Sequence, residues 1–154
     1  MRTIFSVLAL SLISTTALAQ SDQISGVDEA IEFRKSVMNT AGHSARLLMH
    51  MSKGALSHEQ HFTAIANQMA QGAALMKDAF RQNTIGQKTK AKTQVTTNTA
   101  IWDNWEDFSS RADAFAKDTA ATATLANAGD IEGAKASLKA VFSHCKSCHE
   151  KYED

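Results

Sequence analysis

The chain has 154 residues, with 16 basic and 16 acidic side chains and a formal net charge of zero. This length holds one ordinary domain with its own core. Balanced charge without a basic block gives no indication of a nucleic-acid partner or a polybasic membrane patch. The chain has only two cysteines, both within the last ten residues, which excludes a disulfide-rich scaffold.

The start of the chain has the pattern of a secretory signal peptide. Arg2 precedes an apolar run from Ile4 to Ile13, and the small residues around Ala19 form a cleavage pattern. The run is shorter than the about 20 residues that a transmembrane helix needs. We predict a signal peptide at 1–19, cleaved after Ala19, and a mature domain at 20–154 that is periplasmic and not stably inserted in a membrane. An uncleaved membrane anchor is the alternative.

Four stretches have the apolar periodicity of amphipathic helices. They cover residues 27–54, 62–80, 101–128 and 131–152. Gly129 is a plausible left-handed terminator of the third helix, and Asp130 is a suitable cap for the fourth. Residues 81–99 lose the periodicity and predict a long surface connection. Because no strand pattern appears, the sequence predicts an all-α fold, an antiparallel four-helix bundle.

The last predicted helix contains two cysteines and a histidine in close succession. Residues 145–149 read Cys-Lys-Ser-Cys-His. Two thiols one helical turn apart can bond the two vinyl groups of a haem, and the next imidazole can reach its iron. The motif predicts one covalent haem c, with Cys145 and Cys148 as attachment residues and His149 as an iron ligand. His144 could replace His149 only in a distorted helix. A redox dithiol, a structural disulfide and half a zinc site are the alternatives.

Other motifs accompany this pentapeptide and carry a resemblance to a known family. They are the segment 28–34 in the first helix, Ile101-Trp102 with Phe108 in the third, and the segment 145–152 in the last. With the signal peptide and four helices, they resemble the cytochrome c prime family, the class II c-type cytochromes. The chain departs from many relatives at Glu153, where they place a basic residue after the tyrosine.

The resemblance also assigns a role to Met38, four positions after the arginine of the first helix. In the family this residue faces the distal side of the haem. Methionine there implies a six-coordinate, low-spin electron carrier, whereas an aliphatic residue implies a five-coordinate protein that binds small gases. A thioether ligand would block the vacant site that gas binding needs. An ordinary core methionine is the alternative reading of Met38.

Two more residues are candidates for contact with the haem. Arg34 occupies an inner position of the first helix, where an unpaired charge is unfavourable, so we expect a carboxylate nearby. The haem propionates fit a guanidinium well, and an acidic side chain reached along the bundle is the alternative. Trp102 is expected to line the haem or to fill the core beside it.

Together the motif and the resemblance imply a periplasmic mono-haem one-electron carrier that serves redox partner proteins and is not an enzyme. The alternative is a gas-binding protein with an open sixth position on the iron. Relatives often form homodimers through the first two helices, where small apolar residues in this chain would allow close approach.

Overall fold

The computed structural model describes residues 26–56, 59–87 and 98–153. The predicted signal peptide and most of the predicted connection therefore lie outside the described residues. Within these ranges the chain contains no strand. Its helices are α1 (Val27–Ser52), a 3-10 turn (Glu59–His61), α2 (Phe62–Ala74), α3 (Met76–Ala79), α4 (Ala100–Asp103), α5 (Trp105–Asn127) and α6 (Ile131–Tyr152). None of these helices has the length and apolar character that a bilayer crossing requires.

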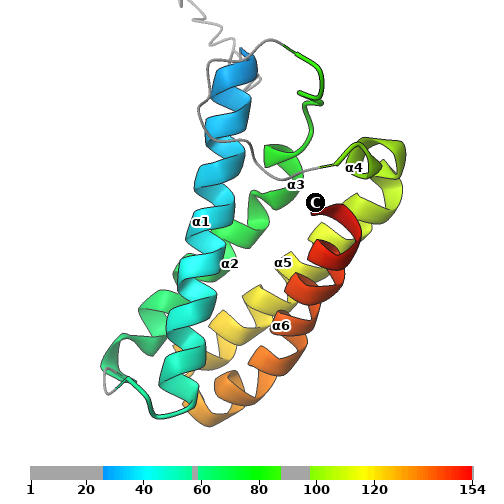
Figure 1. Ribbon diagram of the computed structural model, residues 1–154. Helices are drawn as coiled ribbons and strands as arrows, with labels where there is room; N and C mark the ends of the chain where they lie inside the picture. Colours follow the sequence, from blue (N-terminus) through cyan, green and yellow to red (C-terminus); the bar gives the residue numbers. More distant parts are fainter. Residues whose placement is uncertain (1–25, 57–58, 88–97, 154) are drawn as a thin grey trace, which may run out of the picture.

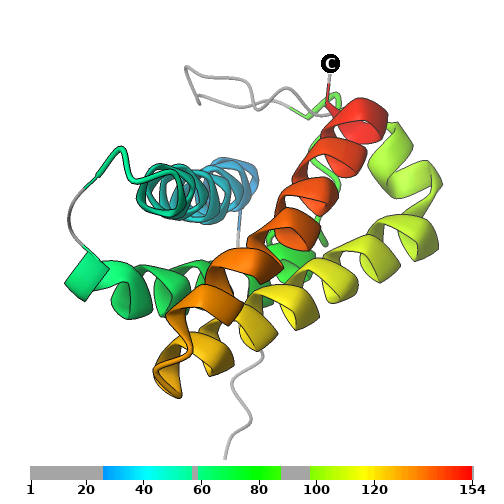
Figure 2. The ribbon, with the colours of Figure 1, turned by 90° about the horizontal axis from the view of Figure 1, so that it is seen from below.

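The four long helices form an antiparallel bundle, as the sequence predicts (Figure 1). Along the chain, α1 packs against α2, α2 against α5, and α5 against α6. Contact between α1 and α6 is sparse by comparison, and the view from below shows α1 standing apart from α6 (Figure 2). The bundle is thus tightly closed on three sides and more open between its first and last helices.

Two of the predicted helices are interrupted, which corrects the sequence prediction. At Leu75 the chain leaves α2 and enters α3, and the Leu75 N–H bonds the Gly72 carbonyl at 3.2 Å, the spacing of a 3-10 turn. At Asn104, with φ of −126° and ψ of 45°, α4 gives way to α5. Apolar residues stay buried on both sides of each break, so the periodicity alone could not reveal it.

The turn between α5 and α6 has the glycine terminator and the aspartate cap that the sequence predicts. Gly129 has a φ of 82°, in the left-handed region that glycine enters without strain. The Asp130 side chain accepts a hydrogen bond from the Gly133 N–H at 2.9 Å and so caps the first turn of α6. This short, capped connection fixes α6 antiparallel to α5.

The core is made mainly of aliphatic residues, alanines and methionines at the bundle's inner positions. The largest side chains that it buries completely include Leu48, Phe62, Met69, Leu138 and Val141. Small residues bring the first two helices together, since a Cβ on Gly72 would lie 3.4 Å from the Thr40 methyl group. The core therefore supports α6 along its buried stripe from Ala134 to Val141 and again at Tyr152, on either side of the cysteines.

Candidate haem site

A cavity of about 240 Å³ lies between α1, α5 and α6, at the end of the bundle where α3 and α4 cover it. Its walls are mostly aliphatic and aromatic, and aromatic rings cover one end. The Phe108 ring centroid lies 5.1 Å from that of Phe80 and 5.4 Å from that of Tyr152. Such a space suits a flat apolar group that reaches the protein between two helices.

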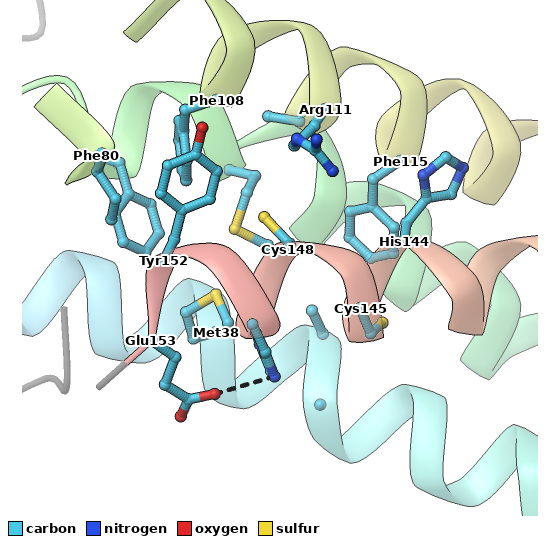
Figure 3. Close-up of a pocket in the computed structure, with 16 residues that line it drawn as sticks. Met38, Phe80, Phe108, Arg111, Phe115, His144, Cys145, Cys148, Tyr152 and Glu153 are labelled. Carbon is cyan, nitrogen blue, oxygen red and sulfur yellow. Dashed lines mark ion pairs between the residues drawn. The ribbon is translucent and has the colours of Figure 1, made fainter. Parts of the chain in front are cut away.

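Both cysteines lie on the wall that α6 contributes to this cavity (Figure 3). Their thiols are half-buried and are not bonded to one another. Burial raises the pKa of the Cys145 thiol and that of Cys148. Since the thiolate is the species that reacts in disulfide exchange, neutral thiols at a helix C-terminus weigh against the redox-dithiol alternative. The two thiols are one helical turn apart on the same face of α6, which is the spacing that two thioether bonds to a haem need.

His149 follows directly and also lines the cavity. Its ring is about half exposed, and Nδ1 lies 3.1 Å from a carboxylate oxygen of Glu153, the pair that is dashed in Figure 3. His144 is held elsewhere, because its Nε2 lies 2.8 Å from Asp118 on α5. Helix α6 continues without a break through both histidines, so it lacks the distortion that ligation by His144 would require.

Met38 lies across the cavity from the pentapeptide. It belongs to α1, is half-buried, and faces the C-terminal turns of α6 (Figure 3). Gly42, one turn further along α1, also lines the cavity and has no atom within 4 Å of the position of a Cβ. A second methionine, Met76 of α3, lines the cavity as well. The structure thus brings Cys145, Cys148, His149 and Met38 to one cavity.

Arg34 is buried, as its inner position predicts, but its partners differ from those expected. Its side chain is 1% exposed and donates to the Ala79 carbonyl at 3.3 Å, the Gln82 carbonyl at 2.8 Å and the Thr84 hydroxyl at 3.1 Å. Among the described residues, no carboxylate pairs with it, so the alternative partner, an acidic side chain, is not found, and carbonyls at and just after the end of α3 accept from the guanidinium instead. The predicted contact with haem propionates stays a prediction.

Trp102 packs with Arg34 and is not part of the cavity wall. The Arg34 guanidinium carbon lies 5.2 Å from the Trp102 ring centroid and 4.9 Å from that of Phe80. The indole N–H of Trp102 donates to the Phe80 carbonyl at 2.9 Å. These contacts tie α4 to the segment after α3, and the role of Trp102 toward a haem also stays a prediction.

The sequence reasoning missed a charged cluster at the cavity's edge. Asp107 accepts hydrogen bonds from Arg111 at 2.7 Å, Lys151 at 3.0 Å and the Tyr152 hydroxyl at 2.5 Å. The bond from Arg111, followed by those from Tyr152 and Lys151, holds the pKa of the Asp107 carboxyl well below its usual range. Asp107 and Arg111 are four residues apart, a spacing that predicts a helical ion pair and could have revealed this half of the cluster.

The donor set fits a haem better than a metal ion held by the protein alone. In the described parts of the chain, no three His, Cys, Asp or Glu side chains are grouped closely enough to hold a metal ion. An apolar cavity lined by two thiols, an adjacent imidazole and a thioether instead has the residue types that bind c-type haem in other proteins. Fold and site together define a haem-binding four-helix bundle of the c type.

Comparison with known proteins gives the family. The family model described as Cytochrome C' matches residues 29–153, and the chain belongs to this family, whose cofactor is covalent haem c with its iron. The chain is 28% identical over 125 residues to a cytochrome c' of Pararhodospirillum photometricum, covering 80% of this chain and 95% of the relative.

Solved structures share the fold at lower identity. Cytochrome c' from Rubrivivax gelatinosus superposes with a TM-score of 0.74 at 21% identity, over 86% of this chain and all of that one. A ferrous variant of cytochrome c prime from Alcaligenes xylosoxidans with bound NO gives a TM-score of 0.71 at 20% identity, over 86% and 98%. These similarities establish the four-helix fold that the sequence predicts.

Proposed function

We propose that this protein is a periplasmic one-electron carrier. Cys145 and Cys148 would hold the haem through thioether bonds, and His149 and Met38 would ligate its iron. The observation that carries the proposal is that Met38, on α1, and His149, on α6, line the same cavity from facing helices. Methionine opposite histidine is a ligand set found in electron-carrying cytochromes c, where it raises the reduction potential.

The helical bundle provides a fixed, largely apolar environment for a haem in the cavity, which suits electron transfer. When bound, the haem would supply a one-electron Fe(III)/Fe(II) couple for exchange of an electron with partner proteins. Met38 and His149 are held on long helices, which limits rearrangement between the two oxidation states. The rings of Phe80, Phe108 and Tyr152 pack together and form an aromatic wall at one end of the cavity. We therefore propose redox partner proteins and no catalytic role.

The proposed location depends on the signal peptide at 1–19. Cleavage after Ala19 would leave Gln20 as the first residue of the mature chain. Intact-mass measurement of the exported protein tests this directly. The expected mass is that of residues 20–154 plus one haem, and a mass that retained residues 1–19 would contradict it.

A second candidate function is the binding of a small gas at an open sixth position. The ferrous cytochrome c prime variant from Alcaligenes xylosoxidans holds bound NO, which is a property of that protein. In this chain Met38 is only half-buried, and the neighbouring Gly42 leaves open space on the same wall. A weakly held Met38 would let a gas molecule take its place.

Visible spectra of the purified holoprotein distinguish the two functions. Oxidised and dithionite-reduced samples are recorded with and without carbon monoxide at neutral pH. Sharp reduced α and β bands that carbon monoxide leaves unchanged are expected for the electron carrier with Met38 bound. A broad high-spin spectrum that carbon monoxide shifts would contradict Met38 ligation and favour the gas-binding function. A sample without haem absorbance would contradict both.

We also propose a homodimer through α1 and α2. Leu47 on α1 has 39% of its surface exposed, and α2 exposes the small residues Ala64 and Ala74. Light scattering after size exclusion measures the mass in solution. A dimer that Leu47→Glu converts to a monomer is the expected result, and a monomeric wild-type protein would contradict the proposal.

A further inference from the structure

Glu153 is bound to the proposed iron ligand by two contacts. Its carboxylate Oε2 lies 3.1 Å from Nδ1 of His149, and its backbone N–H donates to the His149 carbonyl at 3.1 Å. The backbone bond continues the α-helical spacing to the end of α6, which places the Glu153 side chain on the same side as the imidazole. The carboxylate is therefore directed at the one ring nitrogen that would be free of the iron if Nε2 were the ligand.

We propose that Glu153 is a positioning residue that sets the haem potential by accepting a hydrogen bond from Nδ1–H of His149. The proposal rests on the proposed ligation by His149. Ligating histidines commonly donate their second N–H to a carboxylate or carbonyl, which fixes the tautomer and raises the basicity of the ligating nitrogen. A more basic imidazole stabilises Fe(III) over Fe(II), so Glu153 lowers the potential.

The nearby cations are engaged with other carboxylates. Lys151 donates to Asp107 at 3.0 Å, and Lys146 lies 3.6 Å from Glu150. Glu150 thus provides a matched comparison, because it follows His149 directly on the same helix, carries the same charge and is also exposed, but pairs with a lysine instead of the imidazole. The side chains of His149 and Glu153 are about half exposed, so solvent screening reduces the effect of charge alone.

The first test is the midpoint potential of the holoprotein at neutral pH, measured for wild type, Glu153→Gln and the control Glu150→Gln. Glu153→Gln should raise the equilibrium constant for one-electron reduction by about threefold to tenfold, where tenfold equals 59 mV. Glu150→Gln should give less than half of that shift, since it removes the same charge without touching the imidazole. Equal shifts in the two variants, or no shift in Glu153→Gln, would overturn the proposal.

The second test measures the strength of the bond between the iron and His149. In a Met38→Ala background the reduced haem should be five-coordinate, and resonance Raman then reports the iron–histidine stretch. Adding Glu153→Gln should lower this frequency, and adding Glu150→Gln should leave it unchanged. A band that is present but does not respond to Glu153→Gln overturns the role of Glu153 alone. Absence of the band in every variant overturns ligation by His149 and the role of Glu153 together.

Discussion

Arg34 shows how this fold accommodates a buried cation. Burial lowers the pKa of its guanidinium, but arginine remains charged in proteins. Carbonyls of Ala79 and Gln82 accept two of its hydrogen bonds, and the aromatic faces of Phe80 and Trp102 cover the charge. A single residue of α1 therefore holds the end of α3 and the start of the following segment in place.

Replacing Arg34 by leucine should destabilise the protein because two backbone carbonyls lose their donor in a buried region. We expect the free energy of unfolding to fall by roughly 2–4 kcal/mol. Urea denaturation of the holoprotein, followed by far-UV circular dichroism, measures it. Arg46→Leu on the exposed side of the same helix is the matched control and should change stability by no more than about 0.5 kcal/mol. Equal losses in both variants would contradict this account.

Met38 and Met76 provide a direct comparison of two methionines at one cavity. Met38→Ala should remove the sixth ligand, so the reduced protein should lose its low-spin spectrum and bind carbon monoxide. Met76→Ala also removes a thioether from the cavity wall, but should keep the wild-type spectrum. Absorption spectra with and without carbon monoxide measure both. A low-spin spectrum retained by Met38→Ala would rule out the proposed ligand.

At the scale of helices, Asp107 connects α5 to the C-terminal turns of α6. It binds Arg111 on its own helix together with Lys151 and Tyr152 on α6. Tyr152 is buried against Phe108, with the two rings edge to face. The cluster therefore stabilises the end of α6 directly after the haem-binding pentapeptide, where a frayed helix would displace the thiols.

The charge of Asp107 should make stability depend on pH in acid. A folded pKa below the unfolded value, about 3.9 for aspartate, means that the ionised form stabilises the fold. This contribution is present above the unfolded pKa and is lost as pH falls toward the folded pKa. The stability difference between wild type and Asp107→Asn should thus be larger at pH 7 than at pH 3, as measured by urea unfolding. A stability difference that does not change with pH would contradict this prediction. At pH 7 the free energy of unfolding of Tyr152→Phe should lie between those of wild type and Asp107→Asn.

At the scale of the whole molecule, the bundle has a gap between its first and last helices. Helices α1 and α6 have few contacts with each other, and the cavity of about 240 Å³ lies where they diverge. The cofactor is therefore expected to complete the core between the first and last helices. Its removal should loosen this side of the bundle more than the α5–α6 pair.

Loss of the haem should lower stability by several kcal/mol, on the order of 3–5, because the apolar cavity then lacks its occupant. The Cys145→Ala/Cys148→Ala protein cannot attach haem and is compared with the holoprotein by urea unfolding. Wild-type chain produced without haem attachment is the control, since it keeps both thiols and should show the same loss. An apoprotein as stable as the holoprotein would refute the structural role.

The periodicity predicted the four long helices well, because each buries one continuous apolar stripe. The turn before α6 was predictable for a local reason, since Gly129 and Asp130 act on their own backbone neighbours. The breaks at Leu75 and Asn104 were not, because the buried pattern continues across both. The partners of Arg34 were also hidden, since they are mostly carbonyls about 50 residues away that any sequence could supply.

By itself, the sequence determined the helical class, the family resemblance and the residues that we propose bind a haem, because these depend on local spacing and residue chemistry. Only the tertiary structure decided which side chains share the cavity, since Met38 and His149 are far apart in the chain and meet through helix packing. It likewise placed Glu153 on Nδ1 of His149, because the orientation of the last helical turn sets that contact.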